Sequence, residues 1–477
     1  MSDSIDSDAI ALSETSKTEI LTYIDDVIPL NQNDPTVSEQ IPDEFEQNTL
    51  DVLWDLLDPK HGPAKGVKNN RILLPKVLRR LTMKLVLRHN KLPRAFYLKG
   101  VNSTEKENRG AGGFADVFIG EWKGKAVALK RLRVESKSTQ VEEALQKQFC
   151  RESILWMHLD HEHVLPFYGV SDDAFSLSIC MVSPWMHNGN IRHYINDVLR
   201  ETYHVGGQEL VHIVQLHQVT LGLIYLLGED IIHGDLHGGN ILIDARGSVR
   251  LTDLGTGSYI DRTPHPYAFQ YRAPELHDPE EFDLNDDGPT VESDIFAFAC
   301  VCIELYTEHI PFEGISYFRV SKDVVNGLRP PRPVTKDGIV VSDPLWGLIE
   351  HCWSQQPKER PSAHFVEEKL RAIVESGASP GLQIQIATLG KEKEDLQAQI
   401  SQNTKEIAQF RAMLSWHEQE LKQAKELGEK QAIELANMSA RIQDYTDGVD
   451  AISGLVDQLK LRRGGEHGKP VSGGKHK

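Results

Sequence analysis

Cysteine is scarce in this chain, which has five cysteines among 477 residues. They lie at positions 150, 180, 300, 302 and 352, without the spacing of a metal site. An odd number of scattered cysteines argues against a disulfide framework and favours reduced, buried thiols. This pattern predicts a cytoplasmic protein.

The chain also lacks an excess of positive charge and any long apolar run. Its formal net charge of −18 argues against general nucleic-acid binding, because such binding needs basic surfaces. No stretch approaches the roughly 20 consecutive apolar residues of a membrane span. Residues 1–6, MSDSID, have neither the basic nor the apolar region of a signal peptide. We therefore expect no transmembrane segment and no nucleic-acid partner.

The most informative feature that is present is residues 233–240, HGDLHGGN. Asp235 and Asn240 are five residues apart, and Asp253 follows 13 residues after the amide. Phosphoryl transfer from Mg-ATP to a hydroxyl requires a carboxylate for the hydroxyl and two oxygen ligands for the metal. The spacing predicts Asp235 as the base, and Asn240 and Asp253 as Mg²⁺ ligands.

Three further motifs precede this segment in the expected order. Residues 110–117, GAGGFADV, predict a hairpin in which Gly110 and Gly112 let backbone N–H groups close over phosphates. Residues 127–130, VALK, predict a strand that directs Lys130 at the α- and β-phosphates. Glu152 lies in a segment with helical apolar spacing and is the candidate partner of Lys130.

Together these motifs resemble the eukaryotic protein kinase domain over residues 96–376. Within that superfamily the chain is similar to the tyrosine-kinase-like group, especially kinases of mushroom-forming fungi. The segments LPFYG at 165–169, SPWM at 183–186 and RPS at 360–362 carry this similarity. The resemblance implies an α+β, bilobal protein-kinase fold with a small β-rich N-lobe, strands near 96–101, 114–120 and 125–133, and a larger helical C-lobe. C-lobe helices are expected near 190–200, 209–228, 291–308, 344–353 and 362–376.

The resemblance also implies how a nucleotide would be held. Ser183 would guard the back of the adenine site. Pro184 would offer its C=O and Met186 its N–H to the adenine ring. The ring itself would lie between apolar side chains from both lobes. These side chains are Val117, Ala128 and Leu242.

Structural roles for three residues follow from the same resemblance. Asp294 is expected to cap backbone near His233 from within the C-lobe. Glu275 and Arg360 are expected to form an ion pair that braces the activation segment.

Two positions depart from the family pattern. Gly234 replaces the arginine that commonly grips a phosphate on the activation loop, so we expect activity to depend little on phosphorylation of that loop. His237 stands where serine/threonine kinases place a lysine that steadies the transferred phosphate. It could still donate a hydrogen bond, and a slower enzyme is expected.

Two metal motifs are rejected in favour of simpler interpretations. Residues 283–288, DLNDDG, match the front of a calcium loop, but the twelfth position would be Asp294, which the kinase fold needs internally. His158, His161 and His163 suggest zinc, but no fourth ligand is close in sequence. An acidic loop and structural histidines explain both motifs.

The N-terminal part divides into two segments. Residues 1–46 are acidic and poor in large apolar groups, which predicts disorder. Residues 47–95 hold two clusters with helical spacing, which predicts a helical extension packed on the kinase domain or on a partner. The basic run from Lys65 to Arg94 leaves open contact with anionic lipid, although a solvated helix face explains the same charges.

Residues 382–460 repeat apolar side chains every seven residues. The positions are 382, 386, 389, 396, 400, 407, 410, 414, 421, 424, 435, 438, 442, 445, 449, 452, 456 and 459. Such a repeat predicts a coiled coil, and its isoleucines and leucines favour a parallel homodimer. One long helix that folds back on the kinase domain is the alternative. Residues 461–477 are predicted to be a disordered basic tail.

These features together predict an ATP- and Mg²⁺-dependent protein kinase. Its substrates would be protein hydroxyls, those of serine and threonine more than tyrosine. Self-association would place one kinase domain near another. The rival hypothesis is a pseudokinase scaffold that assembles partners through the coiled coil.

Overall fold

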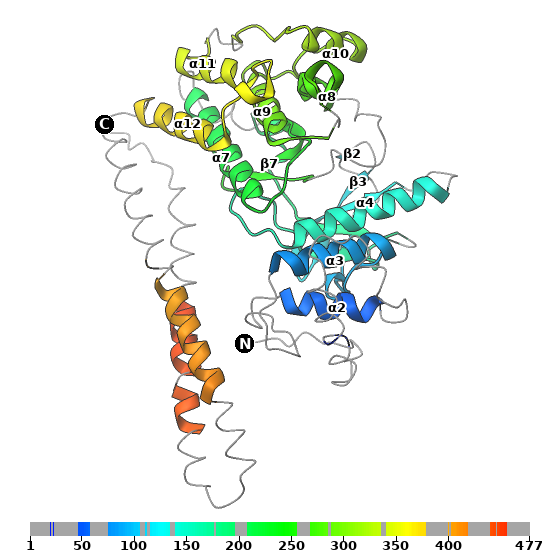
Figure 1. Cartoon of the computed structure of the whole chain (residues 1–477), viewed down its shortest axis with the longest axis vertical. Coiled ribbons are helices and arrows are strands. Elements are labelled where there is room, and N and C mark those ends of the chain that lie inside the picture. The colour runs from blue at the N-terminus through cyan, green and yellow to red at the C-terminus, as the bar shows by residue number, and fades with distance from the viewer. Residues whose placement is uncertain are drawn as a thin grey trace, which may run out of the picture. The chain divides into compact units, whose positions relative to one another are not determined.

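The computed structural model contains two units, residues 1–373 and 374–477 (Figure 1). The described residues are 20, 22, 46–57, 75–104, 110–111, 115–133, 139–175, 178–195, 208–254, 268–284, 288–334, 340–377, 399, 402–417, 439–444 and 446–455. The predicted disordered segments at 1–46 and 461–477 fall almost wholly outside these residues.

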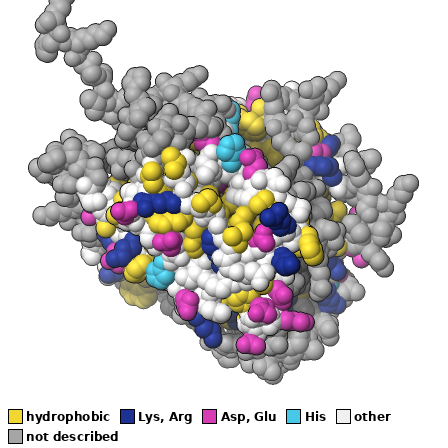
Figure 2. Space-filling model, turned by 90° about the horizontal axis from the view of Figure 1, so that it is seen from above, with side chains coloured by type: hydrophobic (Ala, Val, Ile, Leu, Met, Phe, Trp, Pro, Cys, Tyr) yellow, Lys and Arg dark blue, Asp and Glu magenta, His cyan; other side chains and the backbone are white. Residues whose placement is uncertain are grey.

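Charges of both signs share the described surface. Figure 2 shows Lys and Arg, Asp and Glu, and apolar side chains intermingled on the face seen from above. No single-sign field extends over the described side chains of this face. This mixture agrees with a chain that has no basic excess.

The smaller lobe contains a twisted sheet. Its strands are β1 (Asn102–Ser103), β2 (Gly110–Ala111), β3 (Ala115–Trp122), β4 (Lys125–Leu132), β5 (Gly169–Ser171) and β6 (Cys180–Pro184). The order is β1-β3-β4-β6-β5, and β2 pairs with β3. All of these pairs are antiparallel. A two-residue turn joins β3 to β4, where Lys123 and Gly124 have φ of +50° and +71°.

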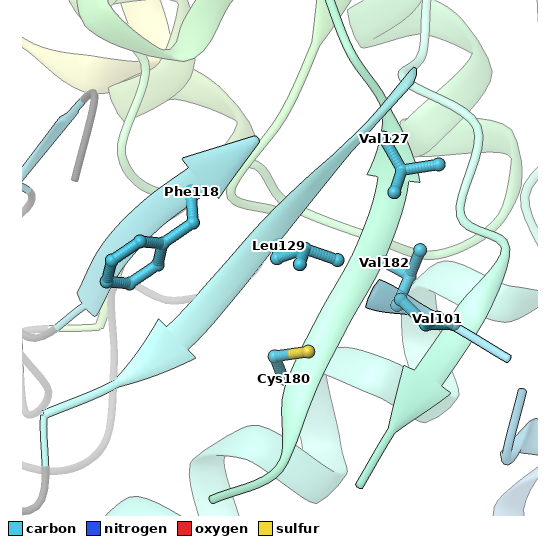
Figure 3. Close-up of a cluster of buried hydrophobic side chains, with 6 residues drawn as sticks. All are labelled: Val101, Phe118, Val127, Leu129, Cys180 and Val182. Atoms are coloured by element: carbon cyan, nitrogen blue, oxygen red, sulfur yellow. The ribbon is translucent and has the colours of Figure 1, made fainter. Parts of the chain in front are cut away.

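Alternation along β3 and β4 gives the sheet two different faces, because successive side chains of a strand point to opposite sides. One face buries a cluster that Figure 3 draws together. Its members are Val101, Phe118, Val127, Leu129, Cys180 and Val182. The opposite face carries Val117, Ile119, Ala128 and Lys130, which are only partly buried. The core therefore lies on one side, and the functional side chains lie on the other.

The strand predicted at 96–101 is reduced to one residue, because only Tyr97 forms a β-bridge, which is parallel and pairs with Val170. Residues Arg94–Phe96 form a 3-10 turn, η4, and the strand β1 begins only at Asn102. The reason is tertiary: Phe96 is fully buried and packs edge-on against Trp54, with ring centroids 4.5 Å apart. Gly100, with φ of +73°, then turns the chain into β1.

Two helices precede the sheet and pack on the lobe. They are α2 (Glu46–Leu57) and α3 (Pro75–His89), and α3 lies beside α4 (Thr139–Met157) in Figure 1. Leu50 and Leu53 of α2 and Leu85 of α3 are fully buried. Trp54 contacts His158 just after α4, with ring centroids 4.6 Å apart. The helices 46–57 and 75–89 thus share a core with the lobe that follows.

The larger lobe is helical. It contains α5 (Ile191–His193), α7 (Gln208–Gly228), η6 (Gly238–Asn240), β7 (Ile241–Ile243), β8 (Val249–Leu251), η7 (Ala268–Tyr271), α8 (Pro274–His277), η8 (Glu280–Phe282), α9 (Val291–Thr307), α10 (Tyr317–Val325), α11 (Asp343–Cys352), η9 (Pro357–Glu359) and α12 (Ala363–Gly377). Helix α9 is its centre, because nearly all of its side chains are buried. Thr290 and Ser293 form a capping box at its start.

Four of the five predicted C-lobe helices are confirmed to within about two residues, namely α7, α9, α11 and α12. The fifth, expected at 190–200, is described only to residue 195. Within α7, residues Val211–Gly228 would pass a length and hydropathy test for a membrane span. Half of that stretch is buried inside the protein, as is typical of a core helix.

In the second unit, residues 402–417, 439–444 and 446–455 are helical. The less exposed positions are 403, 406, 407, 410, 414 and 417 in the first stretch, and 442, 446, 448, 449, 452 and 453 in the others. Half of them, namely 407, 410, 414, 442, 449 and 452, are apolar positions of the predicted seven-residue repeat. His417 and Val449 are buried, at 1% and 8% exposure. One face of each helix is thus covered within a single chain.

Candidate active site

The site is built on the partly exposed face of the sheet. Residues paired directly across antiparallel strands point to the same side. Val117 pairs with Lys130, and Ala128 pairs with Ser183. The sheet therefore places these four predicted nucleotide-binding residues on one face.

Lys130 is the electrostatic centre of the site. Its Nζ lies 2.8 Å from Glu152 Oε1 and 2.8 Å from Asp253 Oδ1. Burial alone would lower the pKa of Lys130, but the two carboxylates outweigh burial and raise this pKa above its ordinary value. The lysine is therefore cationic, and the predicted ion pair with Glu152 is present. The second contact joins the two lobes.

Asp253 is held in an uncommon backbone conformation. It follows β8 and has φ of +58°, in the left-handed region. A non-glycine residue there costs on the order of 1 kcal/mol, so the surrounding fold must hold it in place. Such strain is typical of functional positions. Here it directs the carboxylate to Lys130.

Asp235 and Asn240 lie together in loop 233–240. The Asn240 Nδ2 donates to the Asp235 main-chain oxygen at 2.9 Å and to Asp235 Oδ2 at 3.1 Å. The N–H of Thr252 donates to Asn240 O at 3.1 Å, which ties the loop to the residue before Asp253. The three residues predicted as base and metal ligands are therefore linked in one hydrogen-bonded region.

The side chain of Asp294 accepts hydrogen bonds from the backbone of this loop, and the predicted cap is confirmed. Its Oδ2 accepts the N–H of His233 at 2.8 Å, and its Oδ1 accepts the N–H of Gly234 at 2.9 Å. Burial raises the pKa of Asp294 to about 7 and lowers that of His233 to about 4. Gly234 itself has φ of +74°, which suits glycine.

The same loop has a second support that the sequence did not reveal. Glu304 of α9, 2% exposed, accepts the N–H of Gly238 at 2.9 Å and pairs with Arg192 of α5. Arg192 Nη2 also donates to the Tyr271 hydroxyl at 3.2 Å. The available signal is one acid inside the apolar run 295–306, but its partner lies 112 residues away in sequence.

The structure describes all but one of the remaining residues predicted to bind the nucleotide. Ser183 is buried at the end of β6, followed by Pro184 and Met186. The N–H of Trp185 donates to Ala126 O at 3.3 Å and anchors this segment to β4. Leu242 lies on β7 and Gly110 on β2, whereas Gly112 lies outside the described residues.

Glu275 and Arg360 form the predicted ion pair. Both side chains are fully buried, and two contacts of 2.6 Å join the guanidinium to the carboxylate. Arg360 also donates to the Ser354 and Glu292 main-chain oxygens. A paired and fully hydrogen-bonded buried charge is costly to break, so this pair fixes the chain around α8.

The clustered histidines contact protein groups, and the N–H of His163 donates to His161 Nδ1 at 3.1 Å. His158 contacts Trp54, and His161 stacks on Tyr225 with ring centroids 4.6 Å apart. His163 Nδ1 lies 3.3 Å from Val249 O. These contacts suit structural histidines. The calcium-like segment is only partly described, because residues 285–287 lie outside the described part.

Comparison with known proteins gives a consistent result. Residues 104–370, more than half the chain, match the family described as protein tyrosine and serine/threonine kinase. The chain is 25% identical over 256 residues to serine/threonine/tyrosine-protein kinase HT1 of Arabidopsis thaliana, covering 53% of this chain and 61% of that protein.

Two other relatives are named for different acceptor specificities. Tyrosine-protein kinase Src64B of Drosophila melanogaster is 24% identical over 284 residues, covering 58% of this chain and 47% of the relative. Dual specificity protein kinase pyk3 of Dictyostelium discoideum is 30% identical over 263 residues, covering 54% and 17%. The chain spans less than two thirds of the length of each of these three relatives.

Proposed function

Because the chain belongs to the protein tyrosine and serine/threonine kinase family, we propose that it transfers the γ-phosphoryl group of ATP to hydroxyls of protein substrates. The observation that carries this proposal is the position of Lys130, 2.8 Å from both Glu152 and Asp253. These three residues come from β4, α4 and the segment after β8. Such an arrangement joins the phosphate-binding cation of one lobe to the metal-binding acid of the other.

The residues present fit ATP and Mg²⁺. Asn240 uses its amide nitrogen on Asp235, which leaves the amide oxygen as a ligand atom. An amide oxygen together with the Asp253 carboxylate is the oxygen donor set that Mg²⁺ prefers. When bound, the metal would neutralise charge that develops on the phosphates. Lys130 is cationic, as contact with an anionic phosphate requires.

The residues of the site would then have distinct roles in catalysis and nucleotide binding. Asp235 would accept the proton of the incoming hydroxyl, and its hydrogen bonds with Asn240 fix its orientation. Glu152 would hold Lys130 toward the phosphates. Asp294 would keep the backbone of the loop in place beneath them. On the sheet face, Val117, Ala128 and Leu242 would contact the adenine ring, and the Pro184 C=O and Met186 N–H would bond its edge.

The test is phosphorylation of a generic protein substrate by the purified chain with labelled ATP and Mg²⁺. Replacement of a general base lowers turnover about 10²- to 10⁴-fold, so Asp235→Asn should do so while ATP binding persists. Asp160→Asn, at an exposed aspartate, is the control and should leave turnover unchanged. Equal turnover of wild type and Asp235→Asn would contradict the assignment.

We propose serine and threonine as the preferred acceptors, with tyrosine as the alternative. Relatives named as serine/threonine/tyrosine, tyrosine and dual specificity kinases all align with this chain, so similarity does not decide which hydroxyl is the acceptor. Phosphoamino-acid analysis of the labelled product distinguishes them. Predominant phosphotyrosine would overturn the preference.

The second candidate function is a pseudokinase scaffold. Gly234 and His237 favour it, because neither provides the cation that kinases commonly place at those positions. A wild-type chain that binds ATP but transfers no phosphoryl group would support it. The intact set Lys130, Glu152 and Asp253 favours catalysis.

We further propose that the C-terminal heptads pair helices within one chain. Positions 407, 410, 414, 442, 449 and 452 of the predicted repeat support this proposal, because they are less exposed than their neighbours. The parallel homodimer predicted from the isoleucine and leucine pattern becomes the alternative.

A cytoplasmic location is also proposed. All five cysteines are free and buried, and burial raises the pKa of Cys150 and Cys180 to about 12. Unreactive free thiols suit a reducing compartment.

A further inference from the structure

We propose that Arg79 is a positioning residue, whose ion pair with Glu229 sets the orientation of the small lobe on the large lobe. This inference rests on the proposed kinase function, because that orientation acts through Lys130. The lysine has to lie between Glu152, which the small lobe carries, and Asp253, which the large lobe carries. Arg79 itself belongs to α3, outside the segment that matches the kinase family.

The first observation is the ion pair itself. Arg79 Nη1 donates to Glu229 Oε2 at 2.7 Å, and Glu229 directly follows the last residue of α7. Helix α3 lies beside α4 of the small lobe (Figure 1). The pair therefore joins a helix that packs on the small lobe to the end of a helix of the large lobe.

The second observation is that the same part of α7 holds the segment that follows α4. The Tyr225 hydroxyl accepts the N–H of Asp160 at 2.8 Å, and the Tyr225 ring stacks on His161 with centroids 4.6 Å apart. Tyr225 lies four residues before Glu229, so both side chains lie on one face of α7. The face that binds Arg79 thus also binds the segment after α4.

The third observation is that the N-terminal extension contacts this segment as well. Trp54 of α2 contacts the His158 ring, with centroids 4.6 Å apart. Burial, and after it the nearby charge of Arg79, lower the pKa of His158 to about 4. At neutral pH the ring is therefore uncharged and does not repel the guanidinium. Residues 158–161 thus contact both the extension and α7.

The segment after α4 connects the two carboxylates that hold the lysine of the site. Glu152 lies near the end of α4, just before this segment. Farther along it, the N–H of Leu165 donates to Leu251 O at 2.8 Å, and the N–H of Leu251 donates to His163 O at 2.9 Å. Leu251 ends β8, and Asp253 follows two residues later. Contacts that hold this segment therefore act on both carboxylates.

The exposure of the ion pair determines which property it can change. The side chains of Arg79 and Glu229 are 40% and 30% exposed, and ion pairs at such exposure contribute little to the free energy of unfolding. The pair can still bias the orientation of two lobes, because substitutions in a contact network alter coupling between sites by several-fold. We therefore expect its loss to change activity and nucleotide binding, with the melting temperature nearly unchanged.

Exchange of the two charges in the full-length chain tests this role. Arg79→Glu and Glu229→Arg each bring two like charges together, and the double variant restores an opposite pair. We expect each single variant to lower kcat/KM for ATP about 3- to 30-fold, and the double variant to recover most of that loss. Arg80→Glu, at an exposed neighbouring position of α3, is the control and should leave kcat/KM unchanged.

Thermal unfolding and the affinity for a non-hydrolysable ATP analogue with Mg²⁺ complete the test. The inference holds if the single variants melt near the wild-type temperature, lose activity and analogue affinity, and recover both in the double variant. It is overturned if the single variants keep wild-type activity, if activity follows the melting temperature, or if the double variant is no better than the single ones.

The two proposals fail in different ways. A wild-type chain without phosphoryl transfer would overturn the kinase function, and recovery of analogue affinity in the double variant would then decide the role of Arg79. A wild-type chain that also binds no analogue would overturn both proposals. An active wild type with unimpaired single variants would overturn only the role of Arg79.

Discussion

Gly234 adopts a left-handed backbone conformation and also donates a hydrogen bond. Its φ of +74° lies in the left-handed region, and its N–H donates to the buried Asp294. A side chain in that region costs roughly 1–2 kcal/mol for L-residues. The absent arginine therefore also removes backbone strain that a side chain would bring.

This strain predicts the effect of Gly234→Ala. We expect a loss of about 1–2 kcal/mol in the free energy of unfolding, measured from the urea midpoint. Gly347→Ala is the matched control, because Gly347 lies exposed inside helix α11 with open space around it. That change should stabilise the protein by about 0.5–1 kcal/mol. Equal effects from both would contradict the backbone argument.

Single residues show what a sequence can and cannot reveal about this site. The pairing of Lys130 with Glu152 was predictable because both stand in motifs with a fixed order. Arg192 and Glu304 were not predictable, because neither has a local pattern and their pairing depends on how α5 packs on α9.

At the scale of elements, α3 is a support for α4. Leu85 is fully buried, α3 lies beside α4, and Gln146 of α4 donates to Asn90 O just after α3 at 3.5 Å. Since α4 carries Glu152, any loosening of α3 should reach the ion pair with Lys130. Packing of α3 on α4 thus connects the N-terminal helical extension to the site.

We expect Leu85→Ala to increase amide hydrogen exchange in α4 as well as in α3. Loss of a buried leucine costs about 2–5 kcal/mol through lost burial and the cavity left behind. Arg80→Ala, at an exposed position of α3, should leave exchange in α4 unchanged. Faster exchange confined to α3 would show that the two helices are not coupled.

The C-terminal helices allow a separate prediction. If their seam is covered within one chain, the full-length protein should sediment as a monomer, and Ile407→Asp should lower the melting temperature of the helices. Gln409→Asp, two residues away and exposed, should have little effect. A full-length dimer that dissociates on Ile407→Asp would favour the homodimer instead.

Elements were predicted well where the family resemblance placed them and poorly where tertiary contacts decided. Helices α7, α9, α11 and α12 lie where that resemblance implied helices. The strand expected at 96–101 is reduced to one residue because Phe96 is drawn toward Trp54, about 40 residues upstream. The apolar spacing that predicts α2 and α3 gives no information on which surface they cover.

At the scale of the whole molecule, buried histidines make the free energy of unfolding depend on pH. Burial lowers the pKa of five histidines from 6.5 to about 4, and these are His158, His163, His212, His233 and His277. The unfolded chain binds protons at pH values where the folded chain does not. Stability is therefore present above pH 6.5 and lost as the pH falls toward 4. Asp294 has its pKa raised to about 7, so its protonation stabilises the folded chain as the pH falls below 7 and partly offsets the loss from the histidines.

We expect the urea midpoint to decrease steadily between pH 6.5 and 4.5. The fully buried His233 alone would contribute a loss of up to about 3 kcal/mol by pH 4. His212→Gln should make the decrease shallower, whereas His187→Gln, at an exposed position, should not. A midpoint that stays constant over this range would contradict the histidine argument.

The packing of α2 and α3 on α4 has a practical consequence for the recombinant protein. Sequence similarity to the family begins at residue 104, but the helices packed on this lobe begin at Glu46. A protein truncated at the edge of the similarity would leave the apolar back of α4 open to water, and it should aggregate on expression. Boundaries for expression are better drawn before Glu46 than at the limit of homology.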